Sequence, residues 1–194
     1  MAVFARIGRG IIPLPILWYS GTEIFMDKLK KRKSTRLKGA NYNSNQVVFL
    51  TICTKERQCL LSQIVGTGVP DGPQIELTKY GQIADKYIKQ LNDFYNELSV
   101  EQYVIMPNHI HILLWVKGDG NGPSGTPVPT VQNSIPARFV STFKRFCNKE
   151  YGTNIWQYRS NDHIIRNRED YEEHVKYIHE NPLRWHCDEL YTEE

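Results

Sequence analysis

Two histidines one residue apart are the first feature of this sequence that could do chemistry. His109 and His111 open the run 109–116, whose apolar and β-branched residues predict a strand. Side chains alternate between the faces of a strand, so both imidazoles point one way while Ile110 and Ile112 point the other. Two imidazoles on one face can share a divalent ion. A pair of purely structural histidines would have the same spacing.

A tyrosine and an asparagine near the carboxyl end form the second candidate pair. Tyr177 and Asn181 lie four residues apart in a segment that predicts a helix over 168–181, ended by Pro182. Residues i and i+4 share a helix face, so the phenol and the amide are neighbours. The phenol could attack a phosphate, and the amide oxygen could complete a metal site. The spacing equally fits a tyrosine of the apolar core and an asparagine at the helix C-cap.

The elements that must position these residues alternate between strands and helices. Strands are predicted over 46–54, 100–106 and 109–116, and helices from Thr78 onward, over 134–150 and over 168–181. Pro107-Asn108 is a turn signal between the second and third strands, which therefore form an antiparallel hairpin. Segments rich in Gly and Pro predict loops over 62–74 and 117–129. This order predicts an α+β fold, an antiparallel sheet with helices packed on one face.

The composition is that of an ordinary globular domain. Of the 194 residues, 40% are hydrophobic and 23% are charged, and the formal net charge of +3 fits a nucleic-acid partner without requiring one. The four cysteines lack the Cys-x-x-Cys spacing of a zinc ribbon. The apolar stretch 10–19 is too short and too interrupted by proline to span a bilayer. We therefore expect a cytoplasmic protein with reduced thiols and no membrane partner.

Both motifs together resemble the HUH transposases (His, hydrophobic residue, His), in their REP-associated tyrosine transposase branch. The stretch 103–113, Tyr-Val-Ile-Met-Pro-Asn-His-Ile-His-Ile-Leu, is similar to the family's histidine signature. The segment 156–182, with His-Ile-Ile-Arg-Asn at 163–167 and Tyr-Ile-x-x-Asn-Pro at 177–182, is similar to the tyrosine motif of that branch. The resemblance covers roughly residues 26–185, with both motifs in the family's order.

The resemblance implies a ferredoxin-like (RRM-like) core with the histidine pair on a central strand and a nucleophilic tyrosine on a C-terminal helix. It implies that His109 and His111 are metal ligands, that Tyr177 is the nucleophile, and that Asn181 is the third ligand, where many relatives have Gln. Basic side chains that could contact DNA lie on the last two helices and just before the final one: Lys144, Arg145, His163, Arg166 and Arg168.

The chain is expected to divide into four segments. They are a poorly structured extension (1–25), a basic arm rich in Lys and Arg (26–45), the HUH transposase-like catalytic domain (46–185) and an acidic tail (186–194). The arm could add salt-dependent affinity for phosphates, or it could be a solvated face.

The activity implied by the resemblance is a metal-dependent transposase or nickase. It would cleave and rejoin single-stranded DNA near hairpins through a 5′-phosphotyrosine. A free tyrosine has a pKa near 10, so only about one phenol in a thousand is ionised at neutral pH, a deficit of roughly 4 kcal/mol. A divalent ion would offset part of this by polarising the phosphate, and two imidazoles suit Mn²⁺ as well as Mg²⁺. A monomer and a homodimer with shared sites both remain open.

Two other functions fit parts of the sequence. An RRM-like sheet with Phe49, Tyr103 and Trp115 exposed could bind single-stranded nucleic acid by stacking, without cutting it, as a domesticated transposase would. A two-histidine phosphoesterase needs two His-x-Ser/Thr motifs, and no histidine here is followed two residues later by Ser or Thr. The sequence favours the transposase or nickase.

Overall fold

The computed structural model describes residues 4–7, 10–13, 40–66, 72–118 and 134–192. The chain divides into two units, Met1–Lys33 and Ser34–Glu194. In the first unit, β1 (Phe4–Ile7) and β2 (Gly10–Pro13) pair as an antiparallel hairpin, in a segment whose sequence shows no strand periodicity. Most of the expected basic arm and of the expected 117–129 loop lie outside the described residues.

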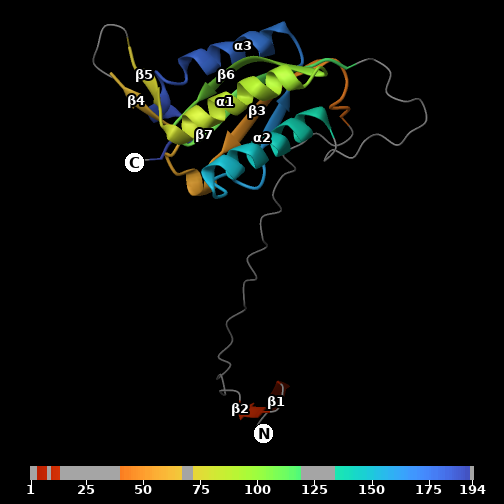
Figure 1. The fold of residues 1–194 in the computed structure, drawn as a ribbon, viewed down its shortest axis with the longest axis vertical. Coiled ribbons are helices and arrows are strands. Elements are labelled where there is room, and N and C mark those ends of the chain that lie inside the picture. The colour runs from red at the N-terminus through yellow and green to blue at the C-terminus, as the bar shows by residue number, and fades with distance from the viewer. Residues whose placement is uncertain (1–3, 8–9, 14–39, 67–71, 119–133, 193–194) are drawn as a thin grey trace, which may run out of the picture. The chain divides into compact units, whose positions relative to one another are not determined.

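A four-stranded antiparallel sheet forms the centre of the second unit (Figure 1). Its strands are β3 (Gln46–Cys53), β6 (Leu98–Ile105), β7 (His109–Val116) and β8 (Asn161–Ile164). They lie in the order β6-β7-β3-β8, and every neighbouring pair is antiparallel. With one helix after β3 and another after β7, this is the predicted ferredoxin-like arrangement. The short and polar β8 gave no strand pattern and was not predicted.

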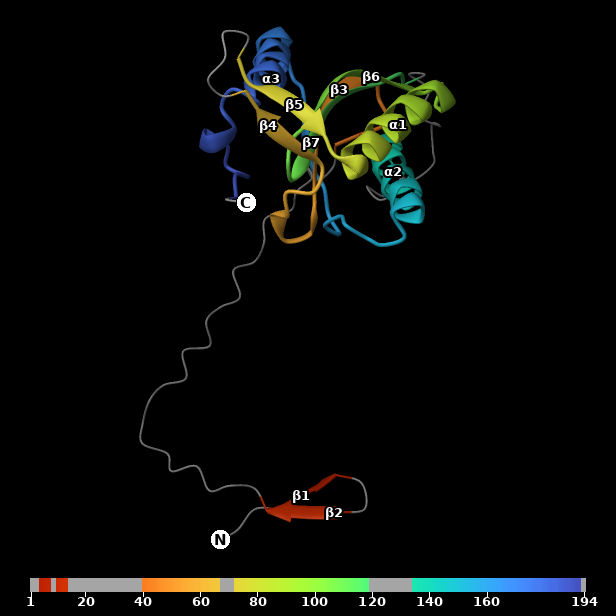
Figure 2. The ribbon, with the colours of Figure 1, turned by 60° about the vertical axis from the view of Figure 1, so that its left-hand side comes forward.

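Helices cover both faces of this sheet (Figure 2). The helices α1 (Lys79–Phe94) and α2 (Ile135–Tyr151) pack on one face, as predicted, over a large apolar core. Thr78 caps α1, since its hydroxyl oxygen accepts from the Gly81 backbone N–H at 3.2 Å. The helix α3 (Arg168–Glu180) lies on the opposite face, where a second, smaller apolar cluster forms. The expected helical layer is therefore joined by a third helix across the sheet.

The pairing of β3 with β7 decides which side chains meet α3. His109 pairs with Cys53, and His111 pairs with Thr51. Because side chains alternate, Ile110 turns into the core under α1 and α2 while the two histidines turn toward α3. The register of two central strands thus fixes the position of both imidazoles beneath the last helix.

A hairpin corrects the loop expected over 62–74. The strands β4 (Ser62–Val65) and β5 (Gln74–Leu77) pair antiparallel, and they were missed because each is only four residues long. Ile64 and Ile75 pack against the smaller apolar cluster, which also includes Trp185. The hairpin therefore supports the chain after α3. No helix among the described residues has the length and apolarity to cross a membrane.

Candidate active site

Two buried imidazoles lie at the beginning of β7. His109 is fully buried, His111 is 3% exposed, and their ring centroids are 4.4 Å apart. The Tyr177 ring of α3 lies 5.1 Å from the His111 ring. The structure therefore brings together the two histidines and the tyrosine that lie some sixty-six residues apart in sequence (177 − 111 = 66).

The Nδ1 atom of each histidine has a partner. The Asn108 side-chain amide donates to the Leu190 carbonyl at 2.8 Å, so its oxygen is the atom 2.8 Å from His109 Nδ1. An amide oxygen only accepts, hence His109 Nδ1 carries the proton and Nε2 offers a lone pair. His111 Nδ1 lies 3.0 Å from the Thr51 hydroxyl oxygen. Such outer contacts orient metal-binding histidines in known sites.

Three buried polar atoms at this place have no partner among the described residues. They are Nε2 of His109, Nε2 of His111 and Oδ1 of Asn181. A buried polar atom without a hydrogen bond costs about 1–3 kcal/mol, so such atoms usually signal a bound ion or water. His109 Nε2 and Asn181 Oδ1 offer lone pairs, and His111 Nε2 does so in the tautomer whose Nδ1–H donates to Thr51. Divalent ions bind such atoms, and the residues therefore fit a metal.

The histidines are neutral at neutral pH. Burial lowers the pKa of His109 to about 4, although the charge of Asp188 opposes the shift. Burial also holds the pKa of His111 well below its usual value, and the neighbouring His109 and His174 add to the effect. A metal ion competes with protons for imidazole nitrogen, so both rings are in the form that binds metal.

Tyr177 lies at the edge of this buried group and remains 41% exposed. Its hydroxyl donates to Asp188 Oδ2 at 2.8 Å. Partial burial, followed by the hydrogen bond to Asp188 and that residue's charge, raises the pKa of Tyr177 above its usual value. The phenol is therefore accessible but held protonated in this arrangement.

Asn181 serves two purposes through different atoms. Its backbone N–H donates to the Tyr177 carbonyl at 2.9 Å, as expected at the C-cap of a helix. Its side chain is buried, and Nδ2 donates to Asp188 Oδ2 at 2.9 Å, which leaves Oδ1 unpartnered. The two interpretations that the sequence left open for Asn181, a helix cap and a ligand, are thus compatible.

Asp188 is a site residue that the sequence motifs did not identify. One ligand atom each from His109, His111 and Asp188 lies within 4.8 Å of the other two. The expected acidic tail thus contributes a carboxylate to the candidate metal site. A usable signal was the presence of Trp185 and Tyr191 around it, because aromatic residues are unusual in a purely solvated tail.

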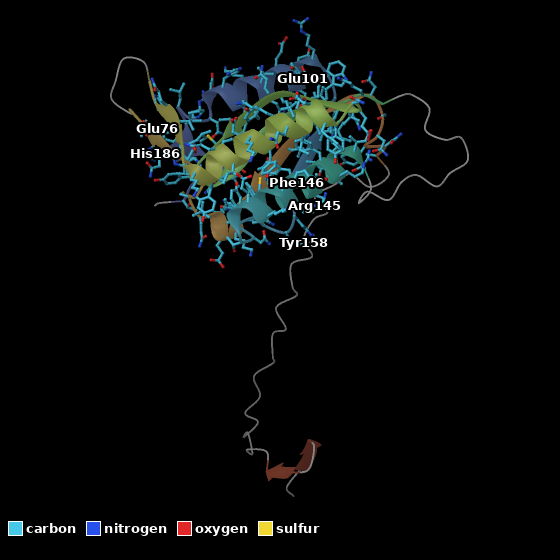
Figure 3. All side chains as sticks on the ribbon, viewed as in Figure 1. Glu76, Glu101, Arg145, Phe146, Tyr158 and His186 are labelled. Atoms are coloured by element: carbon cyan, nitrogen blue, oxygen red, sulfur yellow. The ribbon has the colours of Figure 1, made fainter. Side chains whose placement is uncertain are left out.

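Several hydrogen bonds hold the segment that carries Asp188 against the domain. Asn108 donates to the Leu190 carbonyl, and Arg57 donates to the Glu189 carbonyl at 2.9 Å. Trp185 is 5% exposed and packs 5.2 Å from Tyr191, ring to ring. Figure 3 places the labelled His186 of this segment at the same end of the domain as Glu76 of β5.

The five residues expected to contact DNA lie in two separate places, neither of them in the histidine–tyrosine cluster. Lys144 and Arg145 belong to α2, on the other face of the sheet, and Figure 3 shows Arg145 at the surface there. Lys144 is half-buried and donates to the Gln157 carbonyl at 2.8 Å, and burial lowers its pKa to about 8.

The other three lie where β8 joins α3. His163 contacts the Asp170 carboxylate, and Arg168 pairs with Glu172 at 2.7 Å. Arg166 is exposed. Of the five, Arg145 and Arg166 are exposed and form no ion pair within the described part of the chain. Contact with DNA remains a prediction for all five.

Sequence comparison relates the chain to two known proteins. An uncharacterized protein of Haemophilus influenzae is 33% identical over 175 residues, which cover 84% of this chain and 94% of the relative. The REP-associated tyrosine transposase of Escherichia coli is 29% identical over 111 residues, which cover 57% of this chain and 59% of the relative. No protein-family model matches the chain.

Structural comparison agrees with these relatives. A solved structure of a REP-associated tyrosine transposase bound to a REP hairpin has a TM-score of 0.51 and 23% identity. The match covers 73% of this chain and 69% of that chain, and it shows a common fold. The comparisons therefore agree with each other: the chain is similar in sequence to a REP-associated tyrosine transposase and shares the fold of a solved structure of such a transposase.

Proposed function

We propose that the protein is a metal-dependent tyrosine transposase or nickase that cleaves and rejoins single-stranded DNA near hairpins. The observation that carries this proposal is the group of three orphaned lone-pair donors, from His109, His111 and Asn181, beside the accessible hydroxyl of Tyr177. A covalent nucleophile next to a cation site is what transesterification at a phosphodiester requires.

The covalent step uses the Tyr177 oxygen. Its attack on phosphorus forms a P–O bond to the phenol and breaks the bond to the 3′ oxygen, which leaves as a free 3′-hydroxyl after gaining a proton. The phenolic proton passes to Asp188, whose Oδ2 already accepts it as a hydrogen bond. Reversal by a 3′-hydroxyl rejoins the strand. The phosphodiester bond energy is kept in the phosphotyrosine, so rejoining needs no nucleotide.

His109, His111 and Asp188 would hold the ion, with Asn181 as a further ligand. When bound, a divalent ion polarises the phosphodiester and stabilises the charge that develops on it. We propose Mn²⁺ or Mg²⁺, because the ligands combine two imidazoles with oxygen atoms. Thr51 and Asn108 orient the imidazoles by holding their Nδ1 atoms.

Hairpin-bearing single-stranded DNA is the proposed substrate. The solved relative of similar fold is bound to a REP hairpin, and Arg145 and Arg166 offer exposed guanidinium groups for phosphates. A stacking module without catalysis is a weaker explanation. It needs several exposed aromatic side chains on an open face. Of the three candidates, Trp115 is exposed, but Phe49 is buried beneath α3 and Tyr103 turns to the other face, where it donates to Asp85.

The decisive experiment is incubation with labelled single-stranded DNA that contains a hairpin from the flanks of the gene. We expect a denaturing gel to show a covalent protein–DNA adduct with Mn²⁺ or Mg²⁺, and none with EDTA. Peptide mapping of the adduct should place the DNA on Tyr177. If the protein binds this DNA and forms no adduct with either ion, the proposal of catalysis is wrong.

Asp188→Asn separates two effects of this carboxylate. The variant removes an anionic ligand, so we expect half-maximal cleavage to need more Mn²⁺. It also removes the acceptor of the phenolic proton, so at saturating Mn²⁺ we expect cleavage near neutral pH to stay slower than in the wild type and to rise with pH as solvent takes the proton instead. Glu173→Gln, which neutralises an exposed carboxylate on α3, is the control. An unchanged Mn²⁺ requirement would remove Asp188 from the ligand set.

A further inference from the structure

We propose a second metal-binding site between β8 and α3, formed by His163, Asp170 and His174. One ligand atom from each of these residues lies within 4.8 Å of the other two. They are separate from the ligands proposed for catalysis. Two imidazoles and a carboxylate suit Zn²⁺ and neighbouring first-row ions better than Mg²⁺, which prefers oxygen.

The spacing of the three residues suits an ion that joins a helix to a strand. Asp170 and His174 are at positions i and i+4 of α3 and share one face of it. His163 reaches them from β8, the edge strand beside β3. An ion held here would therefore connect α3 to the sheet.

Asp170 Oδ1 is the common point of this group. It lies 3.1 Å from His163 Nε2 and 3.1 Å from His174 Nδ1. Ligands about 2.0–2.2 Å from a tetrahedral ion are roughly 3.3 Å from one another, so both distances are close to those of a loaded site. The carboxylate is also preset, because Oδ2 accepts from the Arg166 backbone N–H at 2.9 Å.

Ion binding requires a change in the rings but not in the backbone. The two imidazoles are stacked, with 5.0 Å between centroids and 13° between planes, so the lone pairs must be turned toward a common point. The His163 side chain is 42% exposed and has room to turn. His174 Nδ1, now 2.7 Å from the Asp170 carbonyl, binds the ion when its proton is on Nε2. Solvent reaches the group and can complete the coordination.

The reason for such a site lies in how α3 is held. The structure describes this helix in full, and Ile178 is its one buried residue. The Phe49 ring lies 4.5 Å from the His174 ring and 6.1 Å from the Tyr177 ring. Because α3 buries so few side chains, an ion on Asp170 and His174 would restrain the amino-terminal half of this helix, which also carries Tyr177.

Metal titration of the apo protein tests this proposal without a need for activity. We expect calorimetry to find two equivalents of Zn²⁺ in the wild type, one in His174→Gln, one in His111→Phe and none in the double variant. His179→Gln, an exposed histidine on the same helix, should keep both equivalents. Co²⁺ should give visible absorption bands in His111→Phe that are lost when His174→Gln is added.

The outcomes separate the two sites. If His174→Gln binds Zn²⁺ as the wild type does, or His111→Phe binds none, the second site does not exist. His163, Asp170 and His174 then only join β8 to α3 through hydrogen bonds. If His174→Gln loses one equivalent but His111→Phe loses none, the second site stands and the catalytic site fails. Thermal unfolding checks that each variant is folded. As an independent measurement, Zn²⁺ should slow amide exchange in the first turns of α3 in His111→Phe, and unchanged exchange would contradict the restraint.

Discussion

Tyr177→Phe is expected to abolish the covalent adduct and to lower DNA cleavage by at least about four orders of magnitude, the scale of loss when a nucleophile is removed. The substitution removes the oxygen that would attack phosphorus and leaves the ring in place beside His111. It also removes one hydrogen bond to Asp188 at a half-exposed position, so the free energy of unfolding should fall by no more than about 1 kcal/mol. Adduct formation on a denaturing gel and single-turnover cleavage measure the effect.

Tyr171→Phe is the matched control, because Tyr171 belongs to the same helix and packs against the smaller apolar cluster. It should cleave at close to the wild-type rate. DNA binding should survive in both variants, since neither changes a cation. Retention of the adduct in Tyr177→Phe would mean that another group is the nucleophile, and the function proposed for this helix would have to be abandoned.

Much of this site could be predicted from local sequence patterns. Alternation along a strand predicted that His109 and His111 share a face, and the i, i+4 relation predicted that Tyr177 and Asn181 are neighbours. Both relations depend only on residues a few positions apart. That the two pairs meet depends on α3 crossing the sheet, which came from the family resemblance and not from periodicity.

Asp188 shows why the rest of the site was hidden. It lies beyond the end of α3, in a segment whose path is set by contacts with distant residues. Asn108 holds the Leu190 carbonyl, and the β4–β5 hairpin supports the cluster that includes Trp185. No helical or strand periodicity in the sequence predicts that the chain after α3 turns back toward the histidines. The side-chain oxygen of the same Asn108 accepts from His109 Nδ1 and so keeps the proton on that nitrogen. The turn before β7 therefore connects the tail to the histidine pair.

The polar residues of β8 show a second limit. Its sequence, Asn-Asp-His-Ile, has no alternation of apolar and polar side chains, so it did not predict a strand. His163 was therefore expected as a DNA contact near the helix, whereas the strand turns it to Asp170 and His174. Backbone pairing of β8 with β3, which sets His163 opposite Phe49, places this histidine, and intrinsic strand preference does not.

His111→Phe is expected to lower metal-dependent cleavage by at least about a hundredfold, because loss of a ligand removes several kcal/mol of charge stabilisation. The phenyl ring can keep the stacking that His111 makes with Phe49, whose centroid is 4.9 Å away. The variant loses the contact with Thr51, but it no longer buries an unpartnered Nε2. The melting temperature of the metal-free protein should therefore change little, while cleavage falls at every Mn²⁺ concentration.

Acid provides an independent measurement on the same variant. The pKa of His111 is held well below its usual value in the folded protein, so below about pH 6.5 the unfolded chain binds more protons than the folded one. The wild type should thus lose stability as the pH falls from about 6.5, and His111→Phe should lose less of it. His186→Phe, at an exposed position, should match the wild type in both measurements. If His111→Phe cleaves DNA with the wild-type Mn²⁺ dependence, the orphaned imidazole nitrogen is not a ligand, because no other atom of that side chain could take its place.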